Sequence, residues 1–313
     1  MVAAGVDTWS LCWYLAEDSE ALRAAEALAT IPAARSRMFD DQVDDHSVLW
    51  FPGSRMLAVE GHPGGEERLA PVTDLDAAAE RLVGGLQDLG VRVTGGGAKA
   101  GGVRRLDLTC DIERTAVVGR SILNCVAAVE PPGVIRSDVY RSKVGRSIET
   151  IAWRGGRRTV GRVYDKGVER GNGRHKRGEL IRFEDQRRFD RGARPPVHVL
   201  AEGYARSLFH TRFGALRAAT KGVTVTTLDG LCERIEQLVD EGAMTPSQGQ
   251  KLLGHLVLES AGIELGSRTT RWRHRKSVRE GGLILADGVL QDGQEIDLSG
   301  ELDEVFEVAF DAS

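Results

Sequence analysis

Three short segments in the second half of the chain alternate between apolar and polar residues. They cover residues 147–153, 159–166 and 179–189, and the turns between them contain the glycine-rich stretches RGGR and RGNGRHKRG. Alternation with a period of two is typical of half-buried strands, and glycine-rich turns of this kind connect antiparallel neighbours. This pattern constrains the fold most, because it predicts three adjacent antiparallel strands within one sheet.

The remainder of the chain mixes further strands with helices. Pro131 and Pro132 end one predicted helix, since proline cannot continue the backbone ladder, and Pro246 follows Thr245 at the start of another. The resulting fold class is α+β, with an antiparallel core sheet, flanking helices and a helical C-terminal layer. The further predicted strands cover residues 5–15, 55–60 and 104–112, and the predicted helices cover residues 16–30, 73–89, 115–130, 198–220, 227–241 and a segment from 245 onwards.

Charge is segregated along the chain. The 313 residues carry a formal net charge of −4, yet residues 141–194 hold 17 basic and 7 acidic side chains, and residues 281–313 hold 9 acidic and no basic ones. A solvated charged surface explains short runs of charge, but a basic segment of this length favours a surface that binds nucleic acid. The candidate DNA-binding residues are Arg154, Arg157, Arg158, Arg162, Arg182 and Arg187.

These patterns divide the chain into three predicted regions. Residues 1–194 form an α+β core that includes the basic DNA-binding segment 141–194. Residues 195–280 form a helical layer, and residues 281–313 form a short hairpin around Asp287 and Gly288 followed by an acidic tail. We expect the acidic tail to serve solubility rather than to screen the basic surface.

Several protein classes are disfavoured by what the sequence lacks. The four cysteines lie at least 15 residues apart, so they form neither a disulfide framework nor a zinc knuckle. The chain contains no HExxH, no GxSxG and no pair of histidines separated by one residue. No apolar run approaches the roughly 20 residues of a membrane helix. We therefore expect a cytoplasmic protein without a membrane partner.

The run RRLDLTCDIE places two carboxylates on one predicted strand. Asp107 and Asp111 lie four residues apart, so on a regular strand both point to one face together with Thr109. Glu184, in the run ELIRFEDQRRF, joins them if its strand lies beside theirs. Carboxylates that share a face are typical of Mg²⁺ or Mn²⁺ sites for phosphodiester chemistry. The alternative is that Asp111 caps the following turn and only Asp107 points inward.

The run VGRVYDKGVE places a tyrosine between two cations. Arg162, Tyr164 and Lys166 share one face of the predicted strand. The two cations would neutralise a phosphate and lower the pKa of the phenol from its usual value of about 10, which suits a tyrosine nucleophile. A half-buried strand tyrosine with solvated neighbours is the alternative interpretation.

Together these motifs resemble the Rep_trans-type replication initiation factors of rolling-circle plasmids, phages and integrative elements. The ordered set RLDLTCD, ET with a glycine-rich turn, RVYDKGVE and IRFEDQRR spans roughly residues 104–190. The resemblance implies an initiator that binds a replication origin in a single-stranded or cruciform region and nicks one strand through a tyrosine. The tyrosine becomes linked to the 5′ phosphate and leaves a 3′ hydroxyl as primer. A host helicase and a second copy of the chain are further candidate partners. The matched residues are Asp107, Asp111, Tyr164, Asp165, Lys166, Glu169, Arg182 and Glu184.

One stretch departs from the family pattern. Members commonly carry a second tyrosine just upstream, where this chain reads ETIAWRGGRR and has Ala152 and Trp153. If that upstream position supplies the nucleophile, either Tyr164 or Tyr140 replaces it, or the chain is an initiator-like DNA-binding protein without nicking activity. A structural or regulatory protein that docks on RNA or on an acidic partner is a third alternative.

Overall fold

The computed structural model describes most of the chain. The predicted hairpin turn at Asp287 and Gly288 lies outside the described residues, as does Arg157. The described residues are 1–16, 20–30, 37–65, 68–93, 97–128, 134–143, 147–155, 158–170, 175–221, 224–260, 263, 283–285 and 295–308.

One large antiparallel sheet forms the centre of the molecule. Among the described residues, nine strands take part, in the order β2-β3-β4-β1-β5-β9-β8-β7-β6. The three antiparallel strands predicted in the second half are β7, β8 and β9, so that prediction is confirmed. The strands are β1 (Val2–Tyr14), β2 (Arg37–Val43), β3 (His46–Phe51), β4 (Met56–Gly61), β5 (Gly102–Glu113), β6 (Arg136–Arg141), β7 (Ile148–Arg154), β8 (Thr159–Asp165) and β9 (Leu180–Arg188).

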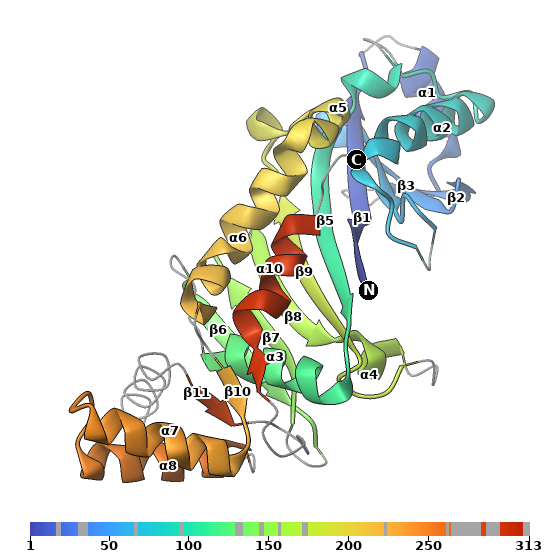
Figure 1. Ribbon diagram of the computed structural model, residues 1–313. Helices are drawn as coiled ribbons and strands as arrows, with labels where there is room; N and C mark the ends of the chain where they lie inside the picture. The colour runs from blue at the N-terminus through green and yellow to red at the C-terminus, as the bar shows by residue number, and fades with distance from the viewer. Residues whose placement is uncertain are drawn as a thin grey trace.

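Helices cover one face of this sheet (Figure 1). Helices α6 and α10 lie along the middle of the sheet, α3 packs on β7 and β8, and α1 and α2 cover the end that holds β2 and β3. The α+β class predicted from the sequence is therefore confirmed. The helices of this layer and its connections are α1 (Glu20–Leu28), α2 (Leu75–Asp88), α3 (Ala116–Ala128), α4 (Lys166–Arg170), α5 (Val197–Val199), α6 (Ala205–Thr220) and α10 (Leu298–Val308).

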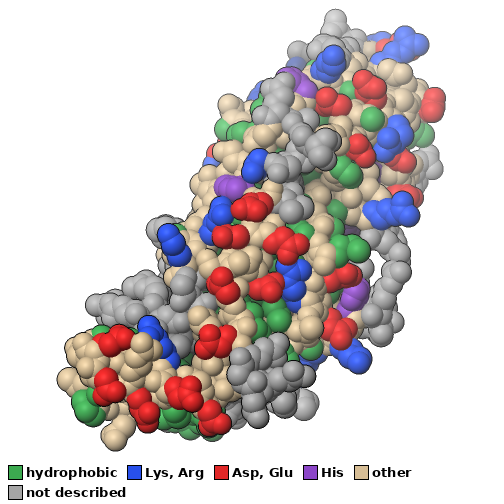
Figure 2. Space-filling model, viewed as in Figure 1, with side chains coloured by type: hydrophobic (Ala, Val, Ile, Leu, Met, Phe, Trp, Pro, Cys, Tyr) green, Lys and Arg blue, Asp and Glu red, His purple; other side chains and the backbone are tan. Residues whose placement is uncertain are grey.

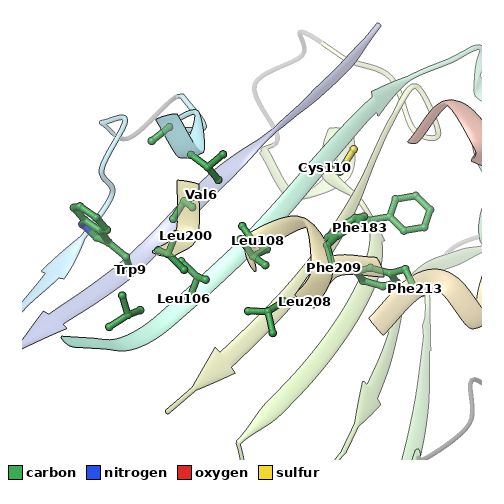
Figure 3. Packing of buried hydrophobic residues seen from close by; sticks show 14 of the residues in the cluster. Val6, Trp9, Leu106, Leu108, Cys110, Phe183, Leu200, Leu208, Phe209 and Phe213 are labelled. Carbon is green, nitrogen blue, oxygen red and sulfur yellow. The ribbon is translucent and has the colours of Figure 1, made fainter. Parts of the chain in front are cut away.

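The hydrophobic core fills the space between the sheet and these helices. Leu106 and Leu108 of β5 and Phe183 of β9 point towards the helices, on the side that holds Leu200, Leu208, Phe209 and Phe213 (Figure 3). The rings of Phe183 and Phe213 pack edge to face, with their centres 5.6 Å apart. Because side chains alternate along each strand, the same strands present polar residues on the opposite face. We call this second face the polar face.

A smaller unit extends from one end of the molecule. Helices α7 (Leu228–Asp240) and α8 (Pro246–Ser260) form a hairpin beside a short sheet in which β10 (Thr224–Thr226) lies between β11 (Leu283–Leu285) and β12 (Ile296–Asp297). Helix α8 begins as the sequence predicts, because the Thr245 hydroxyl accepts a hydrogen bond from the Gln248 backbone N–H.

The end of the chain differs from the predicted acidic tail. Residues 298–308 form α10, which buries Leu298, Leu302, Val305 and Phe306 against the core. These positions follow helical spacing, so the acidic residues between them lie on the outer face of the helix. Figure 2 shows acidic side chains over α10 and over the hairpin of α7 and α8. Two acidic residues of α10, Glu301 and Glu304, form ion pairs with Arg114.

The part of the chain that the structure describes contains no helix that is both long and apolar enough to cross a membrane.

Candidate functional site

The polar face of β5, β9 and β8 carries several of the residues that the sequence predicts for the site. Directly paired residues on neighbouring strands project to the same side of a sheet. The two pairings, β5 with β9 and β9 with β8, therefore align side chains in rows across the three strands. The rows are Asp111, Arg182 and Tyr164; then Thr109, Glu184 and Arg162; then Asp107, Gln186 and Val160.

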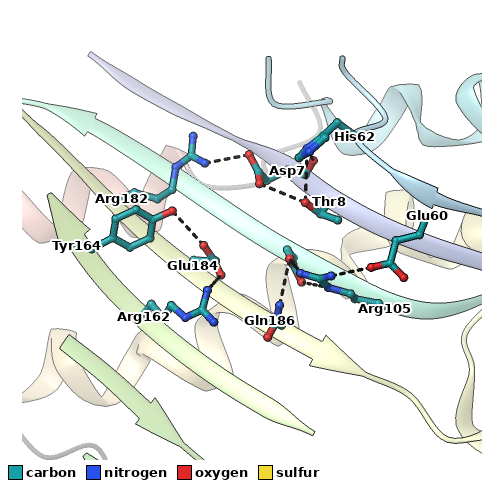
Figure 4. Close-up of polar contacts among 11 residues, drawn as sticks. Asp7, Thr8, Glu60, His62, Arg105, Arg162, Tyr164, Arg182, Glu184 and Gln186 are labelled. Carbon is teal, nitrogen blue, oxygen red and sulfur yellow. Dashed lines mark hydrogen bonds and ion pairs between the residues drawn. The ribbon is translucent and has the colours of Figure 1, made fainter. Parts of the chain in front are cut away.

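Tyr164 and Glu184 form the contact that matters most chemically. The Tyr164 hydroxyl donates a hydrogen bond to Glu184 Oε2 over 3.1 Å, and the Arg162 guanidinium reaches Oε1 over 2.9 Å (Figure 4). The Lys166 ammonium lies 5.7 Å from the centre of the tyrosine ring. The sequence predicts Arg162, Tyr164 and Lys166 on one face of a strand, but β8 ends at Asp165 and Lys166 begins α4. Arg162 is held by the carboxylate. Tyr164 is 8% exposed.

Arg182 connects the edge of this site to two further strands. Its Nε and Nη2 atoms donate to both oxygens of Asp111 over 2.5 and 2.7 Å, and Nη1 donates to Asp7 over 2.9 Å. Asp7 lies where the pairing of β1 with β5 shifts register between Val6 and Thr8. A bulge of this kind redirects a side chain, and here it brings Asp7 to the polar face. The Arg182 side chain is 2% exposed, so the guanidinium is shielded from water, whereas Asp7 is 29% exposed.

Asp107 belongs to a separate chain of contacts. The Arg105 guanidinium donates to both oxygens of Asp107 over 3.1 and 2.6 Å, and also to Glu60 of β4 over 2.7 Å. Gln186 donates to Asp107 from the neighbouring strand. Asp107 and Asp111 thus share a face, as the sequence predicts, but each carboxylate has its own arginine.

Burial changes the acidity of two carboxylates. It raises the pKa of Glu184 above its ordinary value, with further increases from the charges of Asp107 and Asp7, whereas Arg162 and the tyrosine hydroxyl lower it. Burial likewise raises the pKa of Asp107, and the Arg105 hydrogen bonds oppose that change. A raised pKa makes each of these two carboxylates a better proton acceptor than an exposed one.

The three predicted metal ligands do not converge in this arrangement. Asp111 is paired with Arg182, Asp107 with Arg105, and Glu184 with Arg162 and Tyr164. Within the described ranges, no group of three or more histidine, cysteine or acidic side chains is placed to hold a metal ion. The donor set as arranged here therefore does not fit a divalent cation.

Asp165 holds the loop that follows the tyrosine. This buried carboxylate accepts backbone hydrogen bonds from Val168 and Gly178, over 3.3 and 2.7 Å. It joins the start of α4 to the residues that lead into β9, and so it fixes both ends of the connection that begins directly after Tyr164. Its role in this structure is to position the loop.

The predicted DNA-binding arginines occupy different environments. Arg182 is buried, and Arg187 points to the helical face, where it pairs with Asp185 and donates to the Leu208 carbonyl. Arg154 and Arg158 are substantially exposed at the sheet ends and pair with Asp138 and Asp190, while Arg162 is about one third exposed.

The alternative tyrosine lies elsewhere on the sheet. Tyr140 of the edge strand β6 is 51% exposed and pairs with Thr150 of β7, and β6 lies two strands away from β8, which carries Tyr164. In the stretch that departs from the family pattern, Trp153 is buried in the core, whereas Ala152 pairs directly with Arg162 and so lies on the polar face.

A pocket of about 550 Å³ opens beside the Arg182 ion pair. Sequence reasoning missed Asp7, which lines this pocket together with Asp111, His175 and Arg68. The alternation of β1 gives no signal for Asp7, because the bulge that turns it onto the polar face depends on the pairing with β5. Among the lining residues only Asp111 and Arg182 were singled out from the sequence.

Comparisons with known proteins give remote similarities. No protein-family model matches the chain, and no curated protein matches it significantly. A rolling circle replication initiator protein from Geobacillus stearothermophilus has a similar structure, with a TM-score of 0.39 and 14% identity over 69% of this chain and 85% of that one. The TBP of Methanococcus jannaschii gives a TM-score of 0.29 and 10% identity, over 67% and 98% of the two chains. The heterotetrameric sarcosine oxidase of Corynebacterium sp. U-96 gives 0.18 and 16%, over 69% and 83%. At TM-scores below 0.5, these similarities carry no argument about function.

Proposed function

We propose that the protein is a replication initiation protein that binds an origin and nicks one DNA strand through Tyr164. The observation that carries the proposal is the hydrogen bond from the Tyr164 hydroxyl to Glu184, a buried carboxylate with a raised pKa. A phenol is a weak nucleophile until a base removes its proton, and a base within hydrogen-bond distance meets that requirement. The order of motifs around these two residues, which resembles the Rep_trans initiators, supports the same function.

The proposed step is a transfer of the phosphodiester to tyrosine. Glu184 accepts the phenolic proton, the Tyr164 oxygen attacks phosphorus, and the bond from phosphorus to the 3′ oxygen breaks. The 3′ oxygen takes a proton from solvent and leaves as a hydroxyl, while the 5′ phosphate stays on the tyrosine. Arg162 and Lys166 would offset the charge on the phosphate. The covalent link conserves the energy of the broken bond, so the strand can be rejoined later.

The requirement for Mg²⁺ or Mn²⁺ stays a prediction from the sequence. The three carboxylates would hold a cation only after exchanging their arginine partners for it, so no step above depends on a metal. Nicking measured with and without EDTA tests this requirement. A host helicase and a homodimer also stay predictions.

The decisive experiment compares Tyr164→Phe with Tyr140→Phe on supercoiled DNA that carries the cognate origin, with Mg²⁺ or Mn²⁺ present. Phenylalanine keeps the ring and removes only the attacking oxygen. We expect Tyr164→Phe to bind the DNA but to lose both nicking and the covalent adduct seen on a denaturing gel, and Tyr140→Phe to keep them. Nicking that survives in Tyr164→Phe would exclude this tyrosine as the nucleophile.

Ala152 favours a second candidate function, an initiator-like DNA-binding protein without nicking activity. Ala152 lies on the polar face beside Arg162, in the stretch where the family commonly carries its upstream tyrosine. If that position supplies the nucleophile, this chain lacks it. A wild-type protein that binds origin DNA and never forms an adduct would support this candidate.

A further inference from the structure

Two aromatic rings and several arginines gather at the end of the polar face that holds β1, β3 and β4. Tyr14 is 37% exposed, and the guanidinium groups of Arg191 and Arg194 lie 4.5 and 5.7 Å from the centre of its ring. Arg104 lies 5.1 Å from the ring centre of Phe51. Arginine stacked on an aromatic ring provides a flat, cationic surface.

The two rings belong to the same face as Tyr164. Tyr14 pairs directly with Met56, and Met56 pairs with Phe51, so both rings project to one side of the sheet. On that side, Glu60 accepts a hydrogen bond from Arg105, whose other end holds Asp107 (Figure 4). The polar face is therefore continuous from the candidate site to these rings.

The cations here have few acidic partners. Arg188 pairs across the sheet with Arg105, and among the described residues neither Arg188, Arg191 nor Arg194 has a carboxylate partner. The Nη1 atom of Arg104 and the Nε atom of Arg194 lack a hydrogen-bond partner, although an ion pair at 3.9 Å joins Arg104 to Glu60. Both of these atoms are buried, so it is the exposed guanidinium groups of Arg188 and Arg191 that are suited to an incoming anion.

We infer that this arginine–aromatic patch, made of Tyr14, Phe51, Arg104, Arg188, Arg191 and Arg194, binds a single DNA strand through its bases and phosphates. Single-stranded nucleic acid is recognised by cationic grooves with aromatic or arginine planes on which bases stack. A duplex hides its base faces within the stack, so it cannot use the rings in this way. Along β5, about seven residues separate Arg104 from the Asp111 row, which corresponds to roughly 23 Å.

The patch therefore lies several nucleotides from Tyr164 and would hold the strand that flanks the scissile phosphate. That the bound polymer is DNA rests on the proposed function, but binding at the patch does not require cleavage. The two can therefore be tested separately.

The test measures binding of fluorescent oligo(dT) of 4, 8, 12 and 16 nucleotides by anisotropy, in a Tyr164→Phe background that cannot form the adduct. We expect Tyr14→Leu to weaken binding of the longer oligonucleotides by at least about 5-fold, because stacking on one ring is lost. Tyr14→Phe keeps the ring and is expected to retain most of the affinity. The double variant Arg104→Ala/Arg191→Ala should weaken binding and reduce its dependence on salt.

Arg92→Ala, which removes an exposed arginine outside the patch, is the matched control and should bind like its parent. Circular dichroism confirms that each variant is folded. Equal affinity of Tyr14→Leu, Arg104→Ala/Arg191→Ala and the control overturns the patch, as does a parent protein that does not bind oligo(dT). Patch-dependent binding in a protein that never nicks would leave the patch standing while the proposed nicking function fails.

Discussion

At the scale of single residues, the candidate site depends on which arginine each carboxylate contacts. Glu184 contacts Arg162 and the tyrosine hydroxyl, whereas Asp111 forms an ion pair with Arg182. This division separates a chemical role for Glu184 from a structural role for Asp111. The two roles lead to different predictions.

Glu184→Gln should lower the nicking rate by roughly 10²- to 10⁴-fold, the usual contribution of a general base. The wild-type rate should fall as pH drops through the raised pKa of Glu184, because the protonated carboxyl cannot accept the phenolic proton. This acidic limb should lie above the pH expected for an ordinary glutamate, and the variant should lack it. Single-turnover nicking against pH is the measurement. Glu149→Gln, which alters a glutamate paired with Arg177, is the control.

Arg182→Met should destabilise the protein by about 3 kcal/mol or more, because it leaves Asp7 and Asp111 without their shielded cation. Arg177→Met breaks a more exposed pair with Glu149 and should cost less than about 1 kcal/mol. Urea unfolding followed by circular dichroism gives both values. Similar losses for the two variants would contradict the structural role of Arg182.

At the scale of elements, the sequence predicts the positions of strands better than it predicts which residues they pair with. Alternation gives β1, β5, β8 and β9 within a few residues, because period-two burial is a local property. It misses the strands β2, β3 and β6, and it misses the bulge at Asp7 because that bulge depends on the pairing of β1 with the distant strand β5. Asp107 and Glu184 were found as candidates, and so was Arg162, but its pairing with Glu184 was not predicted, and Arg105, the partner of Asp107, was missed. Helix α10 was mistaken for a tail because its charges dominate its composition.

Phe306→Ala tests the docking of α10. Phe306 is buried and packs near Phe209 of α6, with their ring centres 6.3 Å apart. Truncation of a buried phenylalanine should cost about 3 to 5 kcal/mol, whereas an undocked acidic tail would tolerate it. The control is Val257→Ala, at a partly exposed position on α8. Thermal unfolding of both variants is the measurement, and an unchanged melting temperature for Phe306→Ala would contradict the docking.

At the scale of the whole molecule, residues 141–194 present less positive charge to a ligand than their composition indicates. Arg162, Arg177 and Arg182 neutralise carboxylates of the protein itself. Among the described residues of this segment, Arg188, Arg191 and Arg194 have no carboxylate partner, and all three belong to the arginine–aromatic patch. Composition therefore overstates the positive charge that this segment presents to a ligand.

The salt dependence of single-strand binding should reflect that smaller number. Each neutralised phosphate of a single strand contributes about −0.7 to the slope of log K against log salt. Four arginines predict a slope of roughly −3, whereas the excess of ten positive charges in residues 141–194 would give roughly −7. Anisotropy titrations between low and physiological salt distinguish the two values. The steeper slope would mean that DNA displaces the internal ion pairs.

The strand order also says when the site can assemble during synthesis. Strands β1 to β4 form one half of the sheet from the first 61 residues, and β6 to β9 form the other half from residues 136–188. Strand β5 lies between these halves and joins them. Arg182 comes from the second half, and its partners Asp7 and Asp111 come from the first half and from β5. Because β1 leaves the ribosome about 100 residues before its partner β5, the central pairing forms late and at high contact order. Arg182 can therefore contact both Asp7 and Asp111 only after the two halves of the sheet have joined, so these ion pairs mark completed folding.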